Sequence, residues 1–366
     1  MIKNMQINGR QMYWLLISNQ MVMTILLTIA PGLNHAKQNA WFSILISTAV
    51  GAGIAYLCSW VCMRYPGKTL AEFSCEILGK SIGKVITFAY LAEFLLTLSF
   101  ILRQYGDFII GTILPRTPIF AAIVLMICTV LYLSIHGIGG IGRCSEIVGP
   151  FLLLGFLLPV LLSIGKIKLE YLLPVLTDAN MSDIITGALP ASTFLGDCML
   201  IFVIGGFVDG RNQWMKNAIW GVVSTGLLTA ISTIIVTCVF TQEVGGSFAY
   251  PFLMLVRSVT IYGFIENLDV IAISIWIMSI FVKLCVYLFV CSYTASQLFQ
   301  IRKWVPLCIG VAAIASILAM LPRNYVEASV IFPFHVGTRW IFPIFMIGIP
   351  CILWLVSFVR LRSQKV

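Results

Sequence analysis

Charged residues are scarce in this chain. Only 10% of its 366 residues are Asp, Glu, Lys or Arg, whereas 60% are apolar and the mean hydropathy is +1.01. A soluble domain usually carries about a quarter charged residues because its surface must meet water. The scarcity excludes a soluble single-domain enzyme. At roughly 20 apolar residues per membrane crossing, the chain holds about ten transmembrane helices, and we predict a single all-α membrane domain over residues 1–366.

Several motifs that carry chemistry are also missing. The eleven cysteines are scattered through apolar segments without a CxxC pair, and the three histidines lie near the ends of different segments. The sequence contains no HExxH, nucleotide-binding glycine loop or catalytic-triad motif. We therefore expect no enzymatic activity, no bound metal and no cofactor. The net charge of +9 comes without a nucleic-acid-binding motif, so we interpret it as a topology signal and expect no nucleic-acid partner.

Ten apolar segments are long enough to cross a bilayer. Seven of them carry no charge: 11–32, 40–63, 118–136, 147–165, 217–240, 304–322 and 340–359. The other three contain charged residues and are the third, sixth and eighth in order: 82–110, 187–208 and 268–299. We expect the first segment to be an uncleaved helix, because it is too long for the apolar core of a signal peptide.

The distribution of Lys and Arg predicts the orientation. With the N-terminus in the cytoplasm, fourteen basic residues lie in inside segments and seven in outside segments, while Arg103 and Lys283 lie within spans. This bias favours a multi-pass protein with both termini cytoplasmic.

Ten spans divide into two sets of five, and an odd number per set inverts the second set in the membrane. The predicted repeats cover about 11–165 and 187–360. Tyr65-Pro66 after the second span and Tyr250-Pro251 after the seventh each precede an amphipathic stretch, one inside and one outside. The pattern supports an inverted repeat.

In such a fold the first helix of each half, spans 1 and 6, is expected to be broken. Span 6 has Gly196-Asp197 near its middle, and glycine permits non-helical backbone. Span 1 lacks glycine before Gly32, but its polar residues repeat every four positions on one helix face: Gln20, Thr24 and Thr28.

Asp197 is the strongest candidate for a functional residue, because a carboxylate in mid-membrane is expensive and is retained for binding or for pairing. The predicted ligand-binding positions lie on spans 1, 3, 6 and 8: Gln20, Thr24, Thr28, Tyr90, Glu93, Thr97, Leu195, Gly196, Asp197, Cys198, Trp276 and Lys283. For Lys283, pairing with Asp197 or Glu93 is favoured over replacing a transported sodium ion. Arg103 lies closer to the outer surface, where its side chain either snorkels or serves the site.

The segment Tyr250–Phe299 resembles a region of spore germination receptor B subunits of the GerAB/GerKB type. The shared features are Tyr-Pro, an Arg, the run Phe264-Ile265-Glu266-Asn267-Leu268-Asp269 and a Trp-containing helix. Three shorter segments agree: Gln38–Trp41, Ile113–Pro118 and Phe194–Asp197.

The resemblance implies membership of the amino acid/polyamine/organocation transporter superfamily and a LeuT-like fold of five plus five inverted helices. It further implies a location in the inner membrane of a bacterial endospore, an A subunit and a lipoprotein C subunit as partners, and a small germinant, most often an amino acid. Two positions depart from the family pattern. Span 1 usually has a central glycine where this chain reads Met21–Leu27, and Asp197 stands where Glu is common.

Two other functions remain open from the sequence. An ion-coupled amino-acid transporter would share the fold, and an ion channel would line its pore with Glu93, Arg103, Asp197 and Lys283.

Overall fold

The structure is a computed structural model that describes residues 6–176, 180–209, 214–258, 268–301 and 303–363. Part of the sequence motif at Phe264–Asn267 lies outside the described residues, as do four of the basic residues used for orientation: Lys3, Arg211, Arg302 and Lys365. Within the described ranges the chain is helical almost throughout, and the β-type pairing is an isolated parallel bridge between Ile7 and Val208.

The helices of the first half are α1 (Gly9–Ala36), α2 (Ala40–Arg64), the short α3 (Leu70–Leu78), α4 (Lys80–Thr112), α5 (Ile119–Ser134) and α6 (Ile138–Leu162). A connection with short 3₁₀ turns leads to the second half. Its sixth span joins α7 (Met181–Gly196), the 3₁₀ segment η5 (Asp197–Leu200), α8 (Ile201–Ile204) and the 3₁₀ segment η6 (Gly205–Phe207). The remaining elements are α9 (Trp214–Ser247), α10 (Pro251–Ser258), α11 (Leu268–Leu298), α12 (Trp304–Ala319), the π-helical segments η7 (Glu327–Ile331) and η8 (Pro333–Gly348), and α13 (Ile349–Ser363).

Each of the ten predicted spans is a helix in the structure. Seven stretches of the described chain are long and apolar enough to cross a membrane, and the first of them, Gly9–Arg64, contains both α1 and α2. Two shorter apolar helices, α5 and α12, complete the set of ten. The prediction of an all-α membrane protein with about ten spans is confirmed.

The starts of spans 5 and 10 were predicted wrongly. Span 10 was expected to begin at residue 340, but its helical segment begins at Glu327 and includes Arg339. Span 5 was expected to begin at residue 147, but α6 begins at Ile138 and includes Arg143 and Glu146. Glu146 accepts a hydrogen bond from Gln11 and lies 3.3 Å from Arg10. Glu146, in the third turn of α6, is therefore paired with residues of the N-terminal segment, which a search for charge-free windows cannot detect.

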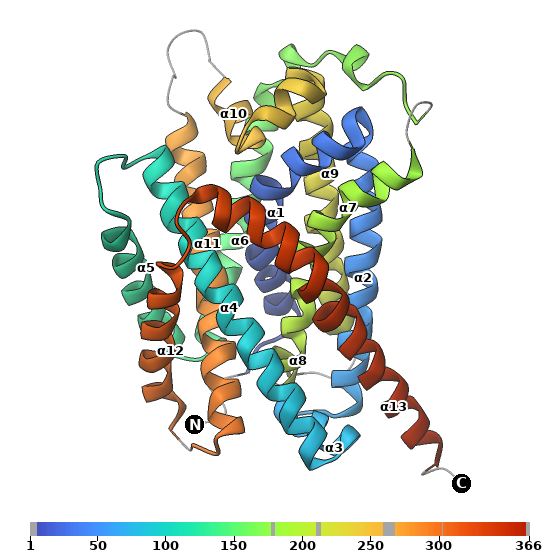
Figure 1. Ribbon diagram of the computed structural model, residues 1–366, viewed down its shortest axis with the longest axis vertical. Coiled ribbons are helices and arrows are strands. Elements are labelled where there is room, and N and C mark those ends of the chain that lie inside the picture. The colour runs from blue at the N-terminus through green and yellow to red at the C-terminus, as the bar shows by residue number, and fades with distance from the viewer. Residues whose placement is uncertain (1–5, 177–179, 210–213, 259–267, 302, 364–366) are drawn as a thin grey trace.

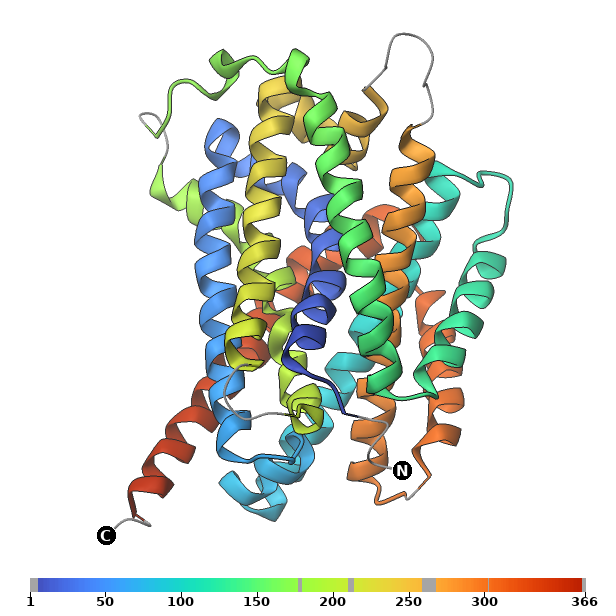
Figure 2. The same ribbon diagram turned by 180° about the vertical axis from the view of Figure 1, so that it is seen from behind.

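Three helical runs form the centre of the bundle. Every residue is buried in 15–29 of α1, in 195–204 of span 6 and in 282–292 of α11. These runs also contain buried polar and charged side chains, among them Gln20, Asp197 and Lys283, which other helices and not lipid must cover. Figures 1 and 2 show α1 enclosed by α6, α7, α9 and α11, with span 10 (η7, η8 and α13) crossing one face obliquely.

The two short amphipathic helices lie at opposite ends of the bundle. Figure 1 shows α3, which follows Tyr65-Pro66, at one end and α10, which begins at Pro251, at the other. The start of α1 and the end of α13 lie at the same end as α3. This arrangement is the one that an inverted repeat requires.

Helix α2 holds span 6 in place through small residues on one of its faces. The hydroxyls of Ser43 and Ser47 donate to the carbonyl oxygens of Ile184 and Ala188 at 2.8 and 2.7 Å. One turn further along, Gly51 lets the backbones approach, because a Cβ there would lie only 2.8 Å from Cβ of Leu195. The contact fixes span 6 up to the point where it changes its winding.

Candidate ligand-binding site

A buried ion pair lies at the centre of the bundle. Nζ of Lys283 on α11 is 2.6 Å from Oδ2 of Asp197, and the two side chains are only 2% and 7% exposed. The Lys283 ammonium also lies 5.8 Å from the ring centres of Phe194 and Tyr287. Because a buried charge without a partner is strongly destabilising, each member of the pair requires the other. The predicted pairing of Lys283 is confirmed, and its partner is Asp197.

Asp197 stands where span 6 changes its winding. Helix α7 ends at Gly196, and Asp197 begins the 3₁₀ segment η5. The predicted break is in the expected place, although the backbone tightens into 3₁₀ turns and does not unwind. Gly196 itself has helical dihedrals, with φ −65° and ψ −17°, so the backbone does not need glycine there. The glycine instead makes room for span 10, because an added Cβ would lie 2.4 Å from Sδ of Met346 on η8.

The predicted break in span 1 is wrong for this structure. Helix α1 is continuous from Gly9 to Ala36. The hydroxyls of Thr24 and Thr28 donate to the carbonyl oxygens four residues earlier in the same helix, each at 2.7 Å. No glycine lies in the run 10–31 to weaken the helix, so span 1 offers no free backbone N–H groups to a ligand at mid-membrane.

Gln20 on α1 hydrogen-bonds to span 6 next to the break in its winding. Its Nε2 donates to the carbonyl oxygen of Leu195 at 2.7 Å, and both residues are fully buried. Cys198, also fully buried, directs its thiol to the carbonyl oxygen of Gly51 at 3.6 Å. These contacts hold the irregular backbone of span 6 between α1 and α2.

Four candidate residues of α4 differ in their hydrogen-bond and ion-pair partners. Thr97 donates to Oε1 of Glu93 at 2.7 Å, and the other Glu93 oxygen is buried without a partner in the described structure. The Tyr90 hydroxyl donates to the carbonyl oxygen of Phe345 at 2.7 Å and so ties α4 to span 10. Arg103 does not reach the outer surface: it is buried and pairs with Asp107 at 3.1 Å.

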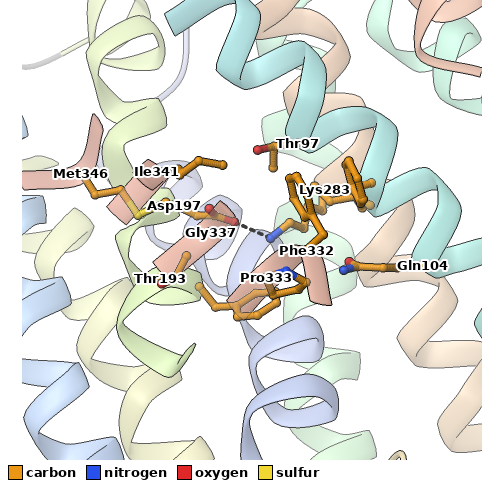
Figure 3. A pocket seen from close by; sticks show the side chains of 13 residues that line it. Thr97, Gln104, Thr193, Asp197, Lys283, Phe332, Pro333, Gly337, Ile341 and Met346 are labelled. Atoms are coloured by element: carbon orange, nitrogen blue, oxygen red, sulfur yellow. Dashed lines mark hydrogen bonds and ion pairs between the residues drawn. The ribbon is translucent and has the colours of Figure 1, made fainter. Parts of the chain in front are cut away.

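A cavity of about 50 Å³ opens beside the ion pair. Figure 3 shows Asp197 and Lys283 pointing toward each other, joined by their ion pair, at its border. Three of the predicted residues line it, Thr97, Asp197 and Lys283. Trp276 does not, because it packs 6.0 Å from the ring of Phe252, next to α6.

The sequence analysis missed one wall of this cavity. Span 10 contributes Phe332, Pro333, Gly337, Ile341 and Met346, and the other missed residues are Phe100, Ile101 and Gln104 on α4 with Thr193 and Phe194 on α7. The predicted span 10, 340–359, began after Arg339 and so left out Phe332, Pro333 and Gly337, although the helical span runs from Glu327. Apart from the adjacent Phe332 and Pro333, its pocket-lining residues follow one another at intervals of four and five. These intervals fit the i→i+5 hydrogen bonding of a π-helix better than the α-helical period of 3.6 residues used for the prediction.

A second cavity of about 560 Å³ adjoins the first toward the end of the bundle that carries α10. Phe194 and Pro333 line both cavities and therefore stand between them. The larger cavity also exposes the ring of His35, which stacks on Phe334 at 6.1 Å. Its size lies in the range of small-molecule sites, whereas the inner cavity in this conformation holds no more than a few waters.

The fold places the protein in a known structural class. It superposes on the structure of MhsT in complex with L-phenylalanine with a TM-score of 0.70, at 13% identity, over 96% of this chain and 88% of that chain. It also superposes on Mhp1, a nucleobase-cation-symport-1 family transporter with bromovinylhydantoin bound, with a TM-score of 0.63, at 14% identity, over 87% and 73% of the two chains. The protein is thus a multi-pass membrane protein of the LeuT fold.

Sequence comparison gives the family. The model of the family described as spore germination protein matches residues 6–328, so the chain belongs to that family. It is 26% identical to spore germination protein YndE of Bacillus subtilis (strain 168) over 85% of this chain and 86% of the relative. It is 23% identical to spore germination protein KB of the same organism over 93% of both chains. The resemblance seen in the sequence is confirmed.

Proposed function

We propose that the protein is the ligand-binding subunit of a germinant receptor in the inner membrane of a bacterial endospore. The ligand is a small zwitterion, an amino acid, that binds between spans 3, 6, 8 and 10. The observation that carries the proposal is the buried Asp197–Lys283 pair, which borders one cavity and lies next to a larger one.

The pair gives a zwitterion two matched partners. Its ammonium group replaces Lys283 beside Asp197, and its carboxylate takes up the released Lys283 ammonium. Exchange of one paired arrangement for another leaves no buried charge unpaired. The continuous helix α1 has no free N–H groups at this depth, so the ligand carboxylate binds Lys283 and not the backbone of span 1.

The ligand reaches the ion pair through the larger cavity. A ligand enters from the end that carries α10, passes Phe194 and Pro333, and reaches the ion pair once these two residues separate. Ligand binding favours the conformation in which the inner cavity is enlarged, because a ligand shifts an equilibrium toward the state it binds better. With both termini cytoplasmic, this entrance faces outward, and the change passes to an A subunit and a lipoprotein C subunit.

The fold supports one other candidate. Both solved structures named above are described with small molecules bound. Mhp1 is described as a transporter. The alternative function is therefore an ion-coupled amino-acid transporter. Uptake of labelled amino acid into proteoliposomes under an ion gradient would favour it over a receptor.

Calorimetry on the purified protein in nanodiscs tests the proposed site. We expect an L-amino acid from a complete panel to bind the native protein and to lose measurable binding in Asp197→Ala. Unchanged binding in Asp197→Ala would remove this residue from the site. Spores that lack the gene, tested against the same panel, should fail to germinate with the amino acid that binds; normal germination would contradict the receptor function.

A further inference from the structure

We infer that the π-helical segment η8 is the specificity wall of the site and that Gly337 sets the size of the ligand side chain. The inference rests on the proposed function and names the ligand class: zwitterionic amino acids whose side chains are apolar and larger than that of alanine.

The cavity has a charged side and an apolar side. The ion pair forms the charged side, and span 10 covers it with Phe332, Gly337, Ile341 and Met346. Figure 3 shows Ile341 and Met346 beside Asp197 and Phe332 beside Lys283. Such a division suits a ligand with a charged head and an apolar side chain.

The polar side chains that line the cavity beside span 10 already donate hydrogen bonds within the protein. Gln104 donates through Nε2 to the carbonyl oxygen of Ala328 at 3.1 Å, and the Thr193 hydroxyl donates to that of Leu189 at 3.0 Å. Thr97 donates to Glu93. Gln104 keeps one N–H, but the span 10 side chains Phe332, Ile341 and Met346 offer no hydrogen bonds. A ligand amide placed against them would lose hydrogen bonds to water that are only partly replaced, so a polar side chain binds less tightly than an apolar one of the same shape.

The winding of η8 creates this wall. Phe332, Gly337, Ile341 and Met346 follow one another at intervals of five, four and five residues. In an α-helix, at about 100° per residue, the last three would lie about 140°, 180° and 320° around the axis from Phe332. The i→i+5 hydrogen bonding of a π-helix brings residues four and five apart onto one face, and η8 is wound in this way over Pro333–Gly348.

Gly337 is the position where the wall lacks a side chain. A Cβ at Gly337 would meet Cγ2 of Thr193 at 3.4 Å, an ordinary van der Waals contact, so alanine fits without displacing a neighbour. The added methyl group would instead occupy space in a cavity of only about 50 Å³. Gly337 therefore reserves room for the end of the ligand side chain.

The test compares three ligands with two matched variants of the full-length protein in nanodiscs. L-Leucine and L-asparagine have nearly the same shape but differ in polarity, and L-alanine has a smaller side chain. Gly337→Ala is compared with Gly310→Ala on α12, where an added Cβ meets no atom within 4 Å. Both variants make the same chemical change in a helix, so a difference between them reports on the cavity.

We expect calorimetry to show that the native protein binds L-leucine at least about tenfold more tightly than L-asparagine. Gly337→Ala should weaken L-leucine binding by about tenfold and leave L-alanine binding within about twofold, and Gly310→Ala should change neither. Equal binding of L-leucine and L-asparagine, or equal loss of L-leucine and L-alanine in Gly337→Ala, would overturn the inference and leave the proposed function standing. If no amino acid binds the native protein, the proposed function fails and the inference fails with it.

Discussion

Lys283 and Asp197 form a contact of 2.6 Å between two spans that the chain separates by 86 residues. Both side chains are buried almost completely. The pair therefore joins the 3₁₀ break of span 6 to the middle of α11, and its contribution to folding can be measured separately from the ligand-binding role that we propose for it.

Removing one charge of the Asp197–Lys283 pair should destabilise the protein more than removing both charges. Lys283→Met leaves the Asp197 carboxylate buried and unpaired, and we expect a loss of about 3–5 kcal/mol in the free energy of unfolding. The double variant Asp197→Leu, Lys283→Met should recover most of that loss. Unfolding by SDS in detergent micelles, followed by circular dichroism, measures both. Additive losses in the double variant would show that the two residues do not depend on each other.

The hydrogen bond from Gln20 to Leu195 should contribute more than the threonine bonds of the same helix. Gln20→Leu removes the side-chain donor from a buried carbonyl at the break of span 6, and we expect a loss of about 1–3 kcal/mol. Thr28→Val is the control, because the Thr28 hydroxyl bonds a carbonyl within its own helix. The same SDS titration compares them. Equal effects would mean that the α1 contact is not what holds the break.

Gly51 should be sensitive to substitution and Gly53 should not. A Cβ at Gly51 would lie 2.8 Å from Cβ of Leu195 and 3.1 Å from Cγ1 of Val222, whereas one at Gly53 meets nothing within 4 Å. We expect Gly51→Ala to destabilise the protein by about 1–3 kcal/mol through overpacking. Gly53→Ala should be neutral or stabilising by up to about 1 kcal/mol. Thermal unfolding in detergent tests both, and a tolerant Gly51 would argue against close packing of α2 on span 6.

The two short helices should lie on opposite sides of the membrane. A reporter fused after Gly67, just before α3, should be cytoplasmic, so green fluorescent protein should fluoresce there and alkaline phosphatase should be inactive. Fusions after Ser258, at the end of α10, should give the reverse result. Matching results at the two sites would contradict the inverted arrangement of the halves.

The apolar segments of the sequence predicted the ten spans, and the charges inside them predicted the Asp197–Lys283 pair. Charges inside spans 3, 6 and 8 are expensive in lipid, so they marked Glu93, Asp197 and Lys283 before any geometry was available. The same reasoning missed the pocket-lining residues of span 10, because they are uncharged and because the predicted span began only after Arg339. The continuity of α1 was also missed, because the expectation of a break came from the fold class and not from the residues 10–31 themselves.

The π-winding of η8 has an evolutionary consequence. A point substitution in this helix changes one lining residue, but inserting or deleting a single residue would rotate the helix face and exchange the whole set at once. The segment matched by the family model ends at residue 328, and η8 begins at Pro333. A change of chain length by one residue in this helix would thus give a descendant protein a new pocket wall while the ion pair at Asp197 and Lys283 stays as it is.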